Sequence, residues 1–416
     1  MLIVEPASEP RPGRKIGVAL AGGGPVGAFY EIGALHALSD ALIGRELTDL
    51  DVYVGVSSGA LIASALANGF DTTSIGSTYL DGGSTELAFS PQLLLQPAVR
   101  EYLSRLGTLP RALAHALRQC ASDQRYDAWA AILGSAGLLL PTALFDNRPF
   151  ERHLRALFAT HGATDDFRKL RAPLYVVATL LDTGAPVVFG EGSLRRVPIS
   201  RAVVASSALP GLFPPVQIGS RSYVDGALVR TMHASLALDA GCDLVICINP
   251  LVPFDASKAR RGSYGSVAAA GLPAILSQTF RTLIHSRMQV GMASYRNRFP
   301  CADQLLLEPD AGDERLFFTN VFRYSGRHRL IEYAYQRTRR DLLAQASALR
   351  PLLERHGLQL NLRLLRMRRR SFLSAKQLRL SRARRAIPGL RSALRRLEQA
   401  LPAVGGRRLI GSARPP

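Results

Sequence analysis

The sequence has no uninterrupted apolar stretch of 18 or more residues, although 47% of its 416 residues are hydrophobic. A helix needs about 20 consecutive apolar residues to cross a bilayer, so no membrane-spanning helix is expected. Residues 1–14 are polar and rich in proline, and they contain no apolar core like that of a signal peptide. These absences favour a cytoplasmic protein with a buried core, preceded by a flexible segment at residues 1–14.

Cysteine and tryptophan are also scarce. The cysteines show neither C-x-x-C spacing nor the density of a disulfide scaffold. Cys242 precedes an apolar strand candidate and Cys247 lies within it, so buried thiols are expected rather than metal ligands. The four cysteines are Cys120, Cys242, Cys247 and Cys301, and the single tryptophan, Trp129, is expected in the core.

Acidic residues are nearly absent from residues 361–416, where 15 Arg and Lys376 stand against Glu398 alone. This segment carries +15 of the chain's net charge of +20, which leaves +5 for the preceding 360 residues. Its leucines recur at helical spacing among arginines, which is typical of a basic amphipathic helix. These leucines are Leu390, Leu394, Leu397 and Leu401.

Ser57 stands in a sequence typical of a nucleophile elbow. A β-branched run at 52–56 leads into G-V-S-S-G, from Gly55 to Gly59, and a small apolar helix-forming run follows at 60–67. The two glycines permit a strand-to-helix turn so tight that the serine is held in a strained conformation, with its hydroxyl above the sheet. Because the pattern also occurs by chance and in nucleotide-binding turns, it leaves both a nucleophile and a phosphate-binding turn open.

A second strand, glycine turn and helix lies upstream of the elbow. Residues 15–20 are an apolar strand candidate, residues 22–27 read G-G-G-P-V-G, and helical spacing resumes at 28–42. Backbone N–H groups in such a turn suit either a phosphate or the oxyanion of an acyl-transfer reaction. A dinucleotide-binding fold would place an acidic residue after the next strand. Here the serine elbow follows instead, which favours the oxyanion.

Asp225 is the candidate base. It follows a strand candidate at 222–224 and precedes Gly226, although Asp-Gly is also an ordinary turn sequence. No histidine stands at a clear strand-to-loop junction, and a partly buried carboxylate with a raised pKa is chemically able to take the serine proton. The histidines are His36, His115, His153, His161, His233, His285, His328 and His356.

Strand and helix candidates alternate along the chain, which predicts an α/β sandwich built on a mostly parallel sheet. The later strands are expected at 172–180, 186–189, 243–249 and 303–308, and the later helices at 272–295 and 327–349. Residues 69–162 are expected to form a helical insertion over the active edge of the sheet, either as a lid or as plain helical packing.

The order of these motifs resembles that of patatin-like phospholipases. The motifs are G-G-G-P-V-G, G-V-S-S-G, A-S-S-A-L-P-G-L-F-P-P at 205–215, and D-G-A at 225–227. The resemblance covers residues 15–250, implies a three-layer patatin-like sandwich, and leaves residues 251–360 to complete the catalytic unit and residues 361–416 as a basic extension. It implies a nucleophile at Ser57, a base at Asp225, turn support from Gly55, Gly59 and Gly226, and an oxyanion hole at Gly22, Gly23, Gly24 and Gly27.

The resemblance further implies a lipid acyl hydrolase that needs no metal or organic cofactor. Many family members carry Arg or Lys where this chain has Val26, which puts ester hydrolysis in general ahead of phospholipid hydrolysis. The basic extension is expected to reach an anionic membrane surface; nucleic acid and an extension without a dedicated role are the alternatives. A silent lipid-binding scaffold and a Ser-His-Asp esterase stay open as rival functions.

Overall fold

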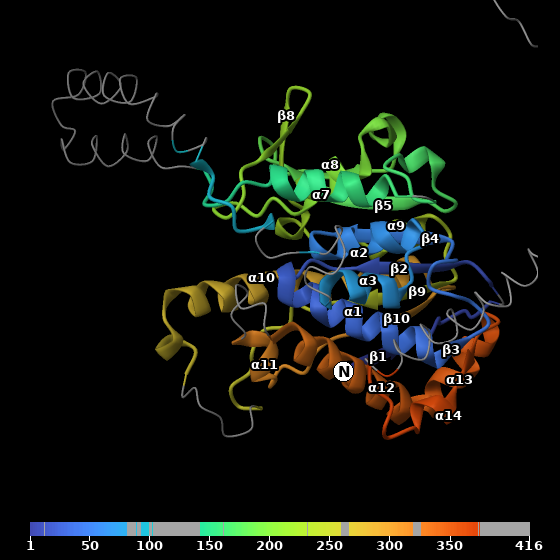
Figure 1. Ribbon diagram of the computed structural model, residues 1–416. Coiled ribbons are helices and arrows are strands. Elements are labelled where there is room, and N and C mark those ends of the chain that lie inside the picture. Colours follow the sequence, from blue (N-terminus) through green and yellow to red (C-terminus); the bar gives the residue numbers. More distant parts are fainter. Residues whose placement is uncertain are drawn as a thin grey trace, which may run out of the picture. The chain divides into compact units, whose positions relative to one another are not determined.

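The computed structural model describes residues 1–11, 13–80, 89, 93–99, 102, 142–160, 162–230, 232–258, 266–318, 326–372 and 374. The chain divides into two units, Met1–Arg368 and Arg369–Pro416. The first unit contains all the helices and strands discussed below (Figure 1).

A nine-stranded sheet forms the centre of the first unit, in the order β1-β10-β9-β2-β4-β5-β8-β7, with β6 also paired to β5. Its five central strands, from β10 to β5, are parallel. The remaining pairings are antiparallel. The strands are β1 (Leu2–Glu5), β2 (Ile16–Leu20), β4 (Val52–Val56), β5 (Leu174–Leu180), β6 (Pro186–Phe189), β7 (Val216–Ile218), β8 (Arg221–Asp225), β9 (Leu244–Ile248) and β10 (Asp303–Leu307).

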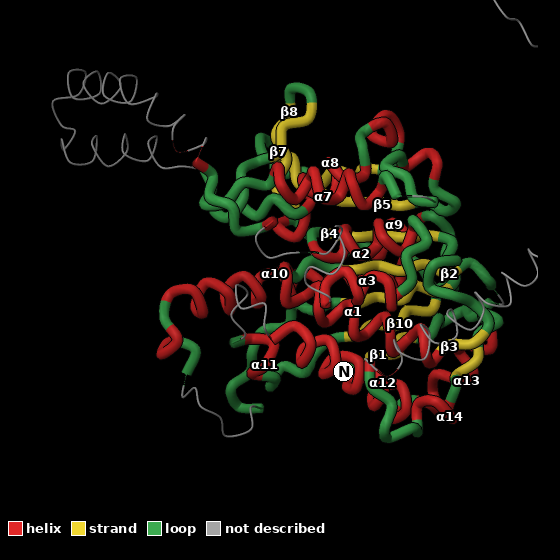
Figure 2. Tube along the Cα trace, in the orientation of Figure 1, coloured by secondary structure: helices red, strands yellow, loops and turns green. Residues whose placement is uncertain are grey.

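Helices cover both faces of this sheet, as the sequence predicts (Figures 1 and 2). Ala19, Val54 and Cys247 pack with α9 (Ala234–Asp239) and α10 (Leu272–Arg298) on one face. Because side chains alternate along a strand, their neighbours point to the other face. The helices of that layer are α1 (Gly24–Ala41), α2 (Ser58–Ala67), α3 (Thr72–Leu80), α7 (Arg148–Phe158), α8 (Ile199–Ser206) and α12 (Arg327–Ala344).

Smaller elements complete the unit. β3 pairs with β11 in a separate two-stranded sheet. These elements are β3 (Leu42–Ile43), η2 (Phe167–Lys169), η3 (Gly192–Arg196), η4 (Gly226–Leu228), η5 (Ala268–Ala270), α11 (Glu314–Phe317), α13 (Ala346–Arg355), β11 (Gln359–Leu360) and α14 (Leu362–Leu365).

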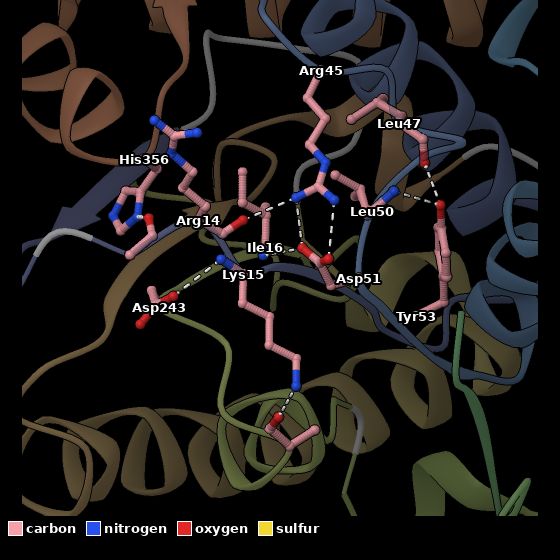
Figure 3. Close-up of polar contacts among 12 residues, drawn as sticks. Arg14, Lys15, Ile16, Arg45, Leu47, Leu50, Asp51, Tyr53, Asp243 and His356 are labelled. Carbon is pink, nitrogen blue, oxygen red and sulfur yellow. Dashed lines mark hydrogen bonds and ion pairs between the residues drawn. The ribbon is translucent and has the colours of Figure 1, made fainter. Parts of the chain in front are cut away.

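Carboxylates tie the strands together near their amino ends (Figure 3). Asp51 accepts a 2.7 Å hydrogen bond from the Ile16 N–H and ion-pairs with Arg45 at 2.6 Å. Asp243 accepts a 3.0 Å hydrogen bond from the Lys15 N–H. These contacts hold together the starts of β2, β4 and β9. In sheets of this kind, sites are expected at the opposite edge, where the parallel strands end.

Three expectations need correction. Residues 1–14 are not a flexible segment throughout, because Leu2–Glu5 form β1 and pair with β10. The helix expected at 327–349 ends at Ala344, and α13 begins at Ala346. Residues 361–368 belong to the first unit, where α14 contacts α1 and α12.

Two other expectations concern residues that the structure describes only in part. The ends of the expected insertion at 69–162 are α3, which contacts α1 and α2, and α7, which contacts α8. Its middle, with Cys120 and Trp129, lies outside the described residues, as do Leu390–Leu401 of the basic extension. Cys242 and Cys247 are buried free thiols, as expected.

Candidate active site

Ser57 occupies the tight turn between β4 and α2. Its backbone has φ 52° and ψ −120°, and it is the single non-glycine residue with positive φ in the described part of the chain. A Cβ at Gly59 would lie 2.4 Å from the Leu20 carbonyl oxygen, and one at Gly55 would lie 2.5 Å from the Ala60 Cα. Because backbone atoms cannot yield to such contacts, both positions require glycine, as the elbow pattern predicts.

Ser206, in the last turn of α8, holds the elbow from behind. Its hydroxyl accepts a 2.8 Å hydrogen bond from the Ser57 N–H and donates one of 2.5 Å to the Val177 carbonyl. All three groups are buried, so these bonds are shielded from competing water. In the sequence, Ser206 appears only as part of the A-S-S-A-L-P block. Its contact with Ser57 was not predicted, because the two residues are 149 positions apart in the chain.

Strands β4 and β8 pair with successive parts of the same edge of β5, and this brings Ser57 and Asp225 together. β6 pairs with Val176–Thr179 along one edge. Along the other edge, β4 pairs as far as Val56 opposite Val177, and β8 ends with Asp225 opposite Ala178. The last residues of β4 and β8 therefore face adjacent residues of β5, and the Ser57 hydroxyl donates a 2.7 Å hydrogen bond to Asp225 Oδ2.

The Asp225 carboxylate is buried and oriented by two further contacts. Its Oδ1 accepts a 2.8 Å hydrogen bond from the Ala227 N–H, and its backbone N–H donates to the Ala208 carbonyl at 3.0 Å. Burial raises the pKa of Asp225 to about 6, and the hydrogen bonds from Ala227 and Ser57 act in the opposite direction. A carboxylate with this pKa is mostly ionised at neutral pH and is a stronger base than an ordinary aspartate.

Gly226 permits the close approach of Asp225 to the sheet. A Cβ at this position would lie 2.2 Å from the Val177 carbonyl oxygen and 3.0 Å from a Val56 methyl group. Glycine is therefore required directly behind the carboxylate for a steric reason, which explains the Asp-Gly pair better than a surface turn does.

The glycine loop lies beside Ser57 at the start of α1. A Cβ at Gly22 would lie 3.1 Å from the Ser57 Cβ, and Gly23 is the N-cap of the helix. The first N–H groups of a helix have no partners within it, so they favour negative charge. The Gly27 N–H differs, because it donates a 3.0 Å hydrogen bond to the Gly23 carbonyl. Val26 is buried at 4% exposure, so this position is part of the core.

A second buried carboxyl, Glu31 in α1, lies near the elbow and was missed by sequence reasoning. Neither of its oxygens has a hydrogen-bond partner among the described residues. Burial raises the pKa of Glu31 well above its usual value, and the neighbouring Ser58 hydroxyl acts against this rise. The available signal was one acidic residue in the otherwise apolar run A-F-Y-E-I-G-A-L.

Histidine does not contact the Ser57 hydroxyl in the part of the chain that the structure describes. Six of the eight histidines are described; His115 and His161 are not. His36 hydrogen-bonds Thr72, and His356 hydrogen-bonds Asp303. Burial lowers the pKa of His233 to about 4. The Ser57 hydroxyl is instead bonded to the Asp225 carboxylate.

Other features of the described residues lie apart from this site. A cavity of about 440 Å³ is lined by charged residues around Asp310 and Arg337, and neither Ser57 nor Asp225 lines it. No group of three His, Cys, Asp or Glu in the described ranges is arranged to hold a metal ion. No helix in those ranges combines the length and apolar character needed to span a membrane.

Comparison with known proteins identifies the family. The model of the patatin-like phospholipase family matches residues 18–238, which is more than half of the chain. The chain therefore belongs to the patatin-like phospholipase family. It is 25% identical over 246 residues to NTE family proteins of Mycobacterium bovis and Mycobacterium tuberculosis, a match that covers 59% of this chain. The matched region spans 32% of those relatives' length.

Two solved structures also match. One is VipD from Legionella pneumophila, with a TM-score of 0.30, 17% identity, and coverage of 62% of this chain and 55% of that one. The other is the type III effector protein ExoU, with a TM-score of 0.28, 18% identity, and coverage of 82% and 62%. With TM-scores this low, neither match adds to the family assignment.

Proposed function

We propose that the protein is a lipid acyl hydrolase, a serine hydrolase with Ser57 as the nucleophile and Asp225 as the general base. The observation that carries this proposal is the 2.7 Å hydrogen bond from the Ser57 hydroxyl to Asp225 Oδ2. The hydroxyl lies in a strained elbow and the carboxylate has a raised pKa, which are the properties that a nucleophile and its base require.

In the proposed reaction, Ser57 Oγ attacks the ester carbonyl while its proton passes to Asp225 Oδ2. The N–H groups of Gly22, Gly23 and Gly24 are the proposed donors to the oxyanion, and the engaged Gly27 N–H is a weaker candidate than the sequence suggested. Collapse of the tetrahedral intermediate breaks the ester bond, and the alcohol leaves with the proton from Asp225. Asp225 then takes a proton from water, whose oxygen attacks the acyl-enzyme. When the bond between the acyl carbon and Ser57 Oγ breaks, Asp225 returns this proton to Ser57 Oγ and the fatty acid is released.

The proposed substrates are phospholipids, lysophospholipids and other carboxylic esters of lipids, so the protein would act in lipid degradation. Ester hydrolysis in general is the broader proposal, since Val26 is apolar and buried where many family members have a cation. The Arg-rich residues beyond 368 are proposed to bring the enzyme to an anionic membrane surface from the cytoplasmic side. Nucleic acid is a less favoured partner for them.

The test compares wild type with Ser57→Ala and Asp225→Asn on a short-chain nitrophenyl ester and on phospholipid vesicles, with fluorophosphonate labelling alongside. Turnover is expected to fall at least about 1,000-fold in both variants, and labelling is expected to disappear in Ser57→Ala. Ser220→Ala and Asp182→Asn, at exposed turn positions, are matched controls that should keep wild-type turnover.

Two outcomes would favour the rival functions. Wild type that neither hydrolyses either substrate nor reacts with the fluorophosphonate would favour a silent lipid-binding scaffold. Turnover that survives in Asp225→Asn but is abolished by replacing one histidine would favour a Ser-His-Asp esterase.

A further inference from the structure

Helix α10 presents an apolar face to solvent. Six of the fourteen large apolar side chains that are exposed among the described residues lie on this one helix. At 3.6 residues per turn they fall within about 140° of its circumference. They are Leu272, Ile275, Leu276, Phe280, Leu283 and Val290, with exposed fractions from 42% to 71%. We refer to these six residues as the α10 apolar face.

The other side of the helix is fixed to the protein. Met288, Met292 and Tyr295 are buried against the sheet. Nearer the start of the helix, the Gln278 side chain hydrogen-bonds both the N–H and the carbonyl of Phe254, at 2.9 and 2.8 Å. Arg281 lies over the Phe317 ring, 5.4 Å from its centre. The apolar face is therefore held outward by contacts on the opposite side, and Figures 1 and 2 show α10 extending away from the sheet at the left of the view.

The charged residues of α10 indicate what kind of apolar partner its exposed face would suit. Its 27 residues include four arginines and no Asp or Glu. Arg296 and Arg298, near its end, pair with Glu5 and Asp239. Arg287 is exposed on the same side as Leu283 and Val290, and no described carboxylate pairs with it. An apolar face that carries an unpaired cation and no acid is complementary to a surface that is apolar inside and negative at its rim, as an anionic bilayer is.

The helix also lies next to the candidate site. Arg287 Nη1 donates a 3.3 Å hydrogen bond to the Leu228 carbonyl, in the short helix η4 that follows Asp225 directly. On the other side of Asp225, the Ala208 carbonyl accepts the Asp225 N–H, and the next residue, Leu209, is exposed. The loop that carries the proposed base therefore contacts α10 through Leu228 and contacts the residue before the exposed Leu209 through Asp225.

We propose that the α10 apolar face docks the protein onto an anionic lipid surface by inserting its leucines, isoleucine, phenylalanine and valine among the acyl chains. The proposal rests on the lipid hydrolase function, because a water-insoluble acyl substrate gives a catalytic domain a reason to hold apolar side chains beside its site. It is separate from the Arg-rich extension, whose proposed attraction to the same lipids would come mainly from its arginines.

The experiment measures co-sedimentation of the full chain with vesicles of phosphatidylcholine and phosphatidylglycerol, for wild type and Leu276→Ser/Phe280→Ser/Leu283→Ser. Salt at ~0.5 M reduces the screening length to a few ångströms and so suppresses attraction by the extension, while apolar insertion persists. Partitioning of the triple variant is expected to fall at least about tenfold under these conditions. The matched control is Ile43→Ser/Leu181→Ser, which removes exposed apolar side chains from other elements and should bind as wild type does.

Three readouts make the outcome decisive. Hydrolysis of the soluble nitrophenyl ester should be unchanged in the triple variant, which shows that the fold and the site are intact. In Phe280→Trp, tryptophan emission should shift to shorter wavelength on these vesicles, beyond any shift that Trp129 gives in wild type.

Vesicle binding by the triple variant that equals that of wild type would overturn the proposal. So would a wild-type dimer that the substitutions dissociate without changing vesicle binding, because a second copy would then occupy the face.

Failure of the hydrolase proposal gives a different result. In that case wild type would not turn over the soluble ester, yet co-sedimentation would still report whether the α10 apolar face binds lipid.

Discussion

At the scale of single residues, the site depends on how Asp225 is kept both buried and reactive. Full burial disfavours its charge, and the hydrogen bonds from Ala227 and Ser57 recover part of that cost. Oδ1 is held by the Ala227 N–H, so Oδ2 is the oxygen that faces the serine hydroxyl. The Ala227 backbone thereby orients the carboxylate for the proposed proton transfer.

The raised pKa of Asp225 predicts the pH dependence of turnover. A base works only when deprotonated, so kcat/KM on a soluble ester should rise with pH, with an inflection near the Asp225 pKa of about 6, and then level off. The measurement is the pH–rate profile of wild type. A kcat/KM that stays constant around pH 6 would exclude Asp225 as the base. An inflection that disappears when a histidine is replaced would exclude it too.

Glu31 predicts a pH dependence of stability. Because its pKa is raised in the folded protein, the folded state keeps the proton to higher pH than the unfolded chain does. Its contribution is full below the unfolded pKa of 4.5 and is lost as pH rises toward the folded pKa. Glu31→Gln should therefore gain stability relative to wild type by up to about 1.4 kcal/mol per pH unit in that window.

Chemical denaturation at several pH values measures this difference. Glu9→Gln, at an exposed position, is the control and should follow wild type at every pH. A Glu31→Gln curve parallel to that of wild type would show that Glu31 is not protonated by folding.

At the scale of elements, the elbow depends on how closely α2 approaches the end of β2. The Gly59 Cα faces the backbone of that strand, so a methyl group there would lie 2.4 Å from the Leu20 carbonyl oxygen and 2.6 Å from that of Ala21. Since the same strand end leads into the glycine loop, the packing of α2 on β2 sets the distance between the proposed nucleophile and the proposed oxyanion donors.

Gly59→Ala should therefore reduce both stability and turnover. We expect a loss of at least about 3 kcal/mol in the free energy of unfolding, measured with urea, because the clash is with backbone. Gly291→Ala in α10 is the matched control: its new Cβ would have the Tyr295 hydroxyl as its nearest neighbour, at 3.9 Å. That variant should gain about 0.5–1 kcal/mol from a lower entropy of the unfolded chain. Equal effects of the two substitutions would contradict the steric account.

At the scale of the whole molecule, the chain divides into a first unit, which contains the candidate site, and a basic extension. The first unit ends at Arg368, and Arg339 Nη2 binds the carbonyls of Leu364 and Met367, each at 2.8 Å, near that end. The extension therefore begins later than its charge pattern suggested.

A chain that stops after Ser374 should keep its fold and its soluble esterase activity. It would lose Lys376 and ten arginines against Glu398 alone. Its binding to anionic vesicles at low salt should fall by at least about tenfold, whereas the salt-resistant part should stay. Loss of soluble-ester turnover in the shortened chain would instead place the extension in the structure of the catalytic unit.

Local sequence patterns predict the fold class and the position of the elbow. Glycines at 55 and 59 around Ser57 predict the elbow because only residues without a Cβ fit between crossing backbones, and β-branched runs predict the central strands. Contacts between distant segments are visible only in the folded chain: β1 lies at the sheet edge, Ser206 bonds the Ser57 backbone, and Asp225 reaches the serine along the shared edge of β5. These depend on strand register and long-range hydrogen bonds, and local sequence patterns carry no information about which remote segment will supply the partner.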